Sequence, residues 1–153
     1  MRKELLLACS LLAPLPLFGF AVTVKAPQTT MISGRHVREA CNRPVDTACT
    51  TFEQAHLDCV CALKGEQWVP SVRITAQPHM YLSHRMYQWH EYSHIVDFED
   101  SMRRHAREIE TQSFDSRDGC EEFLAKTRVA FPSVLREYVR ESTALRDRRY
   151  PDR

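Results

Sequence analysis

Hydrophobic and polar residues alternate along two neighbouring stretches in the middle of the chain. Apolar side chains occur at every second position of residues 54–63, and residues 68–76 show the same alternation. A two-residue period is typical of a β-strand with one buried face. Gly65 lies between the stretches, where a tight turn favours glycine. The pattern predicts two antiparallel strands, and Pro78 is expected to end the sheet region.

Two longer stretches carry apolar residues at helical spacing. Ser83 suits an N-cap, and apolar and histidine residues recur every three or four positions after it. Residues 120–146 repeat this spacing, although Pro132 is expected to kink or divide the helix. Residues 115–119 are expected to form the loop between the two helices.

A shorter helix is predicted after Ser33, with Val37 and Ala40 facing inward. Strands in one part of the chain and helices in another indicate an α+β fold. We therefore expect a small antiparallel sheet packed against the long central helix and the C-terminal helix.

The amino end has the pattern of a secretory signal. Arg2 and Lys3 precede an apolar run that continues to about residue 24. Pro14 and Pro16 interrupt that run, which argues against a stable membrane span, and the small residues of Gly19-Phe20-Ala21 suit cleavage. The sequence thus predicts a signal peptide at residues 1–24 and a secreted or periplasmic domain at residues 25–153. An uncleaved anchor, or a lipoprotein signal ending at Cys9, are the alternatives.

Length and charge narrow the domain count and the class of partner. The 153 residues fit one domain, and 43% hydrophobic with 27% charged residues is ordinary for a globular protein. The formal net charge is only +1. No concentrated basic surface is therefore indicated, and nucleic acid is not an expected partner.

Export changes the interpretation of the cysteines, because an oxidising compartment favours disulfides. Five cysteines would remain after cleavage, so two disulfides and one thiol are expected, without a unique pairing. Cys59 and Cys61 share a strand face and are too close to pair, so each is expected to reach a distant partner, Cys120 being one. A structural zinc site formed by Cys49, His56, Cys59 and Cys61, and a thiol oxidoreductase using Cys59 and Cys61, are the alternatives. The disulfide candidates are Cys41, Cys49, Cys59, Cys61 and Cys120.

The sequence His90-Glu91-Tyr92-Ser93-His94 carries the chemistry. Residues four apart lie on one face of a helix, so the His90 and His94 imidazoles can bind one Zn²⁺ ion. Glu91 would then act as the general base that takes a proton from the attacking water. The competing interpretation is a pair of structural histidines beside a solvated glutamate.

A catalytic zinc needs a third protein ligand, and several acidic residues are candidates. His105 is excluded because it lies about 16 Å from His94 along an unbroken helix. Asp100 would require a turn after the motif, and Glu121 or Glu122 would act from the following helix. Tail residues could also fold back over the site. The candidates are Asp100, Glu121, Glu122, Asp147 and Asp152.

The order of these features resembles a bacterial family of predicted secreted zinc-dependent proteases, known mainly as a domain of unknown function. The resemblance covers about residues 34–147. It implies a zincin-like α+β metallopeptidase domain with His90 and His94 as ligands and Glu91 as base. Members of that family close with a Tyr-Asp pair and a His-Gly pair, whereas this chain ends without that histidine. The motifs that carry the resemblance are Pro78-His79-Met80-Tyr81-Leu82, Trp89-His90-Glu91, His94, Ala106-Arg107-Glu108-Ile109 and Cys120.

Two functions from different classes follow. The first is an exported zinc-dependent metallopeptidase that hydrolyses a peptide or protein substrate, such as one in the cell envelope. The second is a noncatalytic exported zinc-binding or interaction module. An open cleft with Glu91 beside the metal would favour the peptidase, and a buried Glu91 would favour the module.

Overall fold

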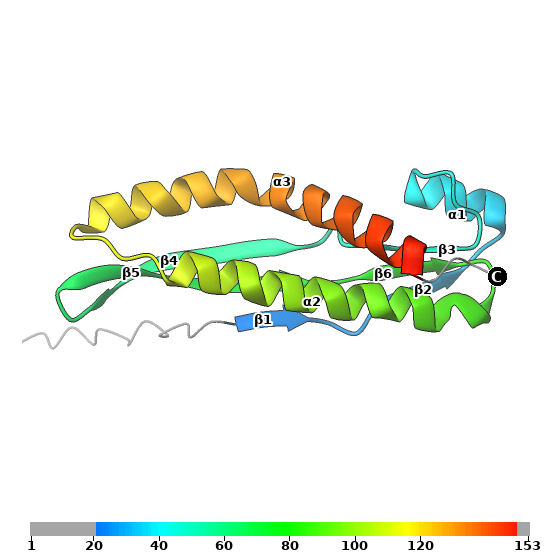
Figure 1. The fold of residues 1–153 in the computed structure, drawn as a ribbon, viewed down its shortest axis with the longest axis horizontal. Coiled ribbons are helices and arrows are strands. Elements are labelled where there is room, and N and C mark those ends of the chain that lie inside the picture. The colour runs from blue at the N-terminus through cyan, green and yellow to red at the C-terminus, as the bar shows by residue number, and fades with distance from the viewer. Residues whose placement is uncertain (1–20, 150–153) are drawn as a thin grey trace, which may run out of the picture.

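The chain folds into two small sheets and three α-helices (Figure 1). The computed structural model describes the backbone of residues 21–149 and the side chains as far as Glu141. The predicted α+β class is confirmed, but both sheets are mixed rather than antiparallel. The longest helices, α2 and α3, lie side by side along the length of the molecule (Figure 1).

The first sheet contains the predicted hairpin. Strands β4 (His56–Lys64) and β5 (Gln67–Ala76) pair antiparallel along their whole length. Gly65 has a positive φ of 64° in the two-residue turn, which explains the glycine there. Strand β1 (Ala21–Val24) adds to β5 in parallel and gives the order β1-β5-β4.

The second sheet continues from the first, because β5 is followed directly by β6 (His79–Leu82). The expectation that Pro78 ends the sheet region is therefore wrong: it ends β5, and its carbonyl accepts a hydrogen bond from the Gln28 amide. Strand β2 (Gln28–Met31) pairs with β6 in parallel, and β3 (Ala48–Thr51) pairs with its other edge antiparallel. Strand β3 is thus an outer strand of this sheet.

Helices α1 and α2 begin close to the predicted positions, but the predicted N-cap of α2 is wrong. Helix α1 (Gly34–Cys41) follows Ser33 as predicted, and Val37 is fully buried. Helix α2 (Gln88–Glu110) follows a short 3₁₀ helix, η1 (Arg85–Tyr87). Ser83 does not cap α2, because its hydroxyl donates to the Thr47 carbonyl at 2.7 Å.

Helix α3 (Arg117–Arg149) forms one continuous element through Pro132 and begins three residues before the predicted start. Helix α2 packs on the sheets through an apolar face with helical spacing, and Phe98 stacks on Phe52 with ring centroids 4.1 Å apart. Burial of this face stabilises the fold by about 25 cal/mol per Å² of apolar area. The buried apolar residues of α2 are Ile95, Phe98, Met102, Ala106 and Ile109.

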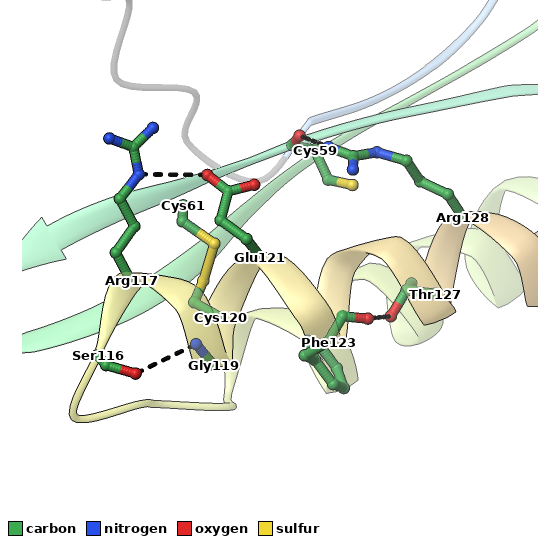
Figure 2. Close-up of a disulfide and its surroundings, with 10 residues drawn as sticks. All are labelled: Cys59, Cys61, Ser116, Arg117, Gly119, Cys120, Glu121, Phe123, Thr127 and Arg128. Atoms are coloured by element: carbon green, nitrogen blue, oxygen red, sulfur yellow. Dashed lines mark hydrogen bonds and ion pairs between the residues drawn. A yellow bond between two sulfur atoms is a disulfide. The ribbon is translucent and has the colours of Figure 1, made fainter.

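Two disulfides staple the fold, as predicted. Cys61 on β4 is bonded to Cys120 on α3 (Figure 2), and Cys41 at the end of α1 is bonded to Cys49 on β3. The expectation that Cys59 also reaches a distant partner is wrong, because it is a buried thiol without a disulfide. The alternative zinc site and the thiol oxidoreductase are both wrong, because Cys49 and Cys61 are already in disulfides.

The predicted signal peptide lies mostly outside the described residues. Its last four residues, Ala21–Val24, form β1, and Val22 is 7% exposed in the core. A mature chain that keeps all of β1 therefore requires cleavage before Ala21, earlier than the predicted boundary at residue 24. No helix in the described part of the chain is long and apolar enough to cross a membrane.

Candidate metal centre

The first two turns of α2 bring the two histidines of the motif together. The Nε2 atoms of His90 and His94 lie 3.2 Å apart, and the rings are inclined by 74°. Two imidazole nitrogens at the usual Zn–N distance in tetrahedral geometry are separated by about 3.3 Å. The donor spacing therefore fits a single zinc ion held by both rings.

Glu91 joins the two histidines from the next position on α2. In the described part of the chain, these three residues form the one such group whose ligand atoms all lie within 4.8 Å of one another. The Glu91 side chain is only 3% exposed. The Thr50 hydroxyl on β3 donates a 2.7 Å hydrogen bond to its carboxylate, so the outer strand fixes the orientation of Glu91.

A pocket of about 250 Å³ opens in front of the three residues. Its walls come from β3, the loop before it, the start of α2 and the second half of α3. Tyr138 on α3 donates a 3.3 Å hydrogen bond to the His94 carbonyl, which ties α3 to the motif. The residues that line the pocket include Arg43, Pro44, Val45, Thr47, Thr50, Phe52, Tyr87 and Val139, with His90, Glu91, His94 and Tyr138.

Three of the predicted third ligands lie away from this centre. Asp100 is exposed, and because α2 runs unbroken through it, it lies about 9 Å beyond His94 along the helix. Glu121 and Glu122 form ion pairs with Arg117 and Lys126 on α3. They lie about 25 Å along α3 from Tyr138, the residue of that helix that contacts the motif.

The two remaining candidates, Asp147 and Asp152, stay predictions. Asp152 lies outside the described residues, and so does the side chain of Asp147. The backbone of Asp147 continues α3 beyond Tyr138.

His105 takes no part in the centre, as predicted. It lies three turns further along α2, where its ring stacks on Phe131 and its Nε2 atom is buried without a hydrogen-bond partner. Burial lowers the pKa of His105, and Glu108 at 3.9 Å opposes that shift only in part. A neutral, packed histidine is the result.

Three residues of the site were not foreseen from the sequence: Arg43, Thr50 and Tyr138. Thr50 follows Cys49 in a short run of β-branched and aromatic residues, which is a weak strand signal. Tyr138 occupies an inward position of the predicted C-terminal helix, which indicated burial but no partner. Arg43 lies in a loop, where no periodic pattern operates.

No family model matches this chain, and comparison with curated proteins and with solved structures gives no match either. The geometry of α2 and β3 is therefore the only support for the candidate metal centre.

Proposed function

We propose that this protein is an exported zinc-dependent metallopeptidase. The observation that carries the proposal is the 3.2 Å separation of the His90 and His94 Nε2 atoms in a pocket that Glu91 also lines. Two histidines four residues apart on a helix, with a glutamate after the first, are typical of zinc hydrolases.

The chain supplies two metal-binding histidines and a proton-transfer group that peptide hydrolysis would use. His90 and His94 would hold the metal. A bound zinc ion polarises a carbonyl group and makes water a nucleophile near neutral pH. Glu91 would accept a proton from the attacking water and deliver it to the departing amine, while Thr50 keeps the carboxylate in place.

The position of β3 supports a peptide substrate. Consecutive residues from Thr47 to Thr50 line the pocket, so the edge of the strand borders it rather than one face. Within the described residues, β3 pairs only with β6. An extended peptide laid along its other edge would find backbone hydrogen-bonding groups beside the metal donors.

Export is supported by the disulfides and by the amino-terminal pattern. Two disulfides in a small domain are typical of a periplasmic or extracellular protein. Zinc, a peptide or cell-envelope substrate, and secretion therefore form one consistent proposal.

One observation favours the second function, a noncatalytic zinc-binding or interaction module. Glu91 is almost completely buried and hydrogen-bonded to Thr50. Its carboxylate lies close enough to both histidines to act as a ligand itself. In that case Glu91 would hold metal and would not act as a base.

The two functions predict different results for Glu91→Gln. Zinc content of the purified mature protein and hydrolysis of casein should be measured for wild type, Glu91→Gln and His94→Ala. Glu108→Gln is the matched control, because Glu108 is an exposed glutamate on the same helix. A peptidase requires near-stoichiometric zinc in wild type, Glu108→Gln and Glu91→Gln, with hydrolysis lost in Glu91→Gln and both properties lost in His94→Ala.

Loss of zinc from Glu91→Gln would instead assign Glu91 as a ligand and support the module. A wild type that takes up no zinc after reloading would refute the peptidase and leave a disulfide-stapled interaction module that does not bind metal.

A further inference from the structure

The loop at residues 42–47, between α1 and β3, forms one wall of the metal pocket. Arg43, Pro44, Val45 and Thr47 all line the pocket. Arg43 is the one cationic side chain among the described lining residues, the histidines aside, and it is half-buried.

Three features hold this loop in one conformation. The Cys41–Cys49 disulfide closes it, with a sequence separation of only 8. Asn42 ends α1 in the left-handed region, with φ 49° and ψ 40°. A Cβ atom on Gly34 would lie 2.7 Å from the Asp46 carbonyl oxygen, so glycine there lets the loop pack on α1. The backbone that carries Arg43 is therefore held in place.

A second pocket of about 440 Å³ adjoins the first. The two share Arg43, Thr50, Phe52 and Val139, which makes Arg43 a boundary residue between the metal donors and the second pocket. The second pocket has an apolar wall from α3, and its lining also includes two arginines and one glutamate. The apolar wall is Pro132, Leu135 and Val139, and the charged residues are Arg43, Arg136 and Glu53.

We propose that Arg43 is a specificity-determining residue that binds the carboxylate of an acidic side chain in the substrate peptide. This inference rests on the proposed peptidase function and names its substrate class. A guanidinium group offers paired N–H donors that match a carboxylate, and partial burial strengthens such a pair. The apolar wall on α3 would pack against the methylene groups of a glutamate. A basic side chain would face Arg43 and Arg136 and be repelled.

Binding can be measured apart from catalysis by using Glu91→Gln loaded with zinc. Fluorescein-labelled peptides should carry either glutamate or glutamine at one of several positions in an otherwise uncharged sequence. Fluorescence anisotropy then gives the Kd ratio of each matched pair. At one position we expect glutamate to bind on the order of tenfold to a hundredfold more tightly, the range of a charge-assisted hydrogen bond.

In the same background, Arg43→Gln should reduce that ratio to about one, and Arg43→Lys should retain part of it. Arg140→Gln is the matched control, because Arg140 is an exposed α3 residue outside both pockets and should leave the ratio unchanged. Thermal unfolding followed by circular dichroism checks that each variant is folded.

Equal binding of glutamate and glutamine at every position, or a preference that survives Arg43→Gln, would overturn the assignment. If Arg43→Gln does not fold, an undiminished preference in Arg43→Lys would overturn it instead. Hydrolysis of the same peptides by the parent protein is scored separately. A glutamate preference without hydrolysis would refute the peptidase and leave carboxylate binding by Arg43 standing.

Discussion

The two disulfides should differ in what their removal costs. Cys61–Cys120 joins β4 to α3 across a sequence separation of 59, and Cys41–Cys49 closes a separation of 8 beside the metal pocket. A disulfide stabilises mainly by restricting the unfolded chain, and the effect grows with the length of the closed loop. The long-range disulfide should therefore contribute more to the free energy of unfolding.

The chain-entropy relation gives the magnitudes. It predicts that loss of Cys61–Cys120 lowers the free energy of unfolding by about 4 kcal/mol, and loss of Cys41–Cys49 by about 2.5 kcal/mol. With an m value of about 1.5 kcal/mol/M in urea, the unfolding midpoints should fall by about 2.7 M and about 1.7 M. Paired alanine substitutions, Cys61→Ala/Cys120→Ala and Cys41→Ala/Cys49→Ala, remove each disulfide without leaving a partner thiol.

Substrate binding should depend more on the Cys41–Cys49 disulfide than on Cys61–Cys120. Removing Cys41–Cys49 frees the loop that carries Arg43, so the glutamate preference of the peptide-binding assay should fall. Removing Cys61–Cys120 should leave that preference intact well below the unfolding midpoint, because this disulfide lies away from both pockets.

An equal or larger stability loss in the Cys41–Cys49 variant would refute the loop-entropy reasoning. An unchanged glutamate preference in that variant would show that the left-handed Asn42 and the packing on Gly34 hold the loop without the disulfide.

Three further changes test individual contacts. Thr50→Val removes the hydroxyl that donates to Glu91 and should lower the free energy of unfolding in urea by about 1.5–3 kcal/mol. If the effects of Thr50→Val and Glu91→Leu are additive in a double-mutant cycle, the two side chains do not interact. Burial lowers the pKa of His105, so the unfolded chain binds its proton more tightly, and stability should decrease as pH falls below about 6.5 towards the folded-state pKa. His105→Leu should flatten that dependence between pH 5 and 7, and an unchanged slope would assign it to other groups. Burial raises the pKa of the Cys59 thiol and shields it from reagents. In the absence of reductant, the chain from Ala21 onward should therefore react with Ellman's reagent at one thiol when unfolded and at none when folded.

Local periodicity explains which elements could be predicted. The β4–β5 hairpin and α2 have long, regular patterns and bury one face each, so the sequence period reports the structure directly. The two histidines of the candidate metal centre could be predicted for the same reason, because His90 and His94 need only a helix to meet.

The short strands could not be predicted. Strands β1, β2, β3 and β6 have four residues each, and they are specified by pairing with distant segments rather than by a pattern of their own. The contact between Thr50 and Glu91 depends on that pairing, because β3 reaches α2 only as the neighbour of β6. The sequence pattern therefore did not indicate the residues that β3 contributes to the site.

The third ligand illustrates a constraint that the topology adds. A short connection joins α2 to α3, and the helices run antiparallel, so the start of α3 lies beside the end of α2 and its second half beside the motif (Figure 1). A ligand supplied by α3 or the following residues must therefore lie near or beyond Tyr138, which excludes Glu121, whereas Asp147 lies about 14 Å further along α3 and stays a prediction. Asp147→Ala should weaken zinc affinity at least tenfold in a competition titration with a chelator, whereas Glu121→Ala should not change it. Unchanged affinity in Asp147→Ala and also in Asp152→Ala would leave His90, His94 and Glu91 as the complete protein ligand set, and would support the noncatalytic module.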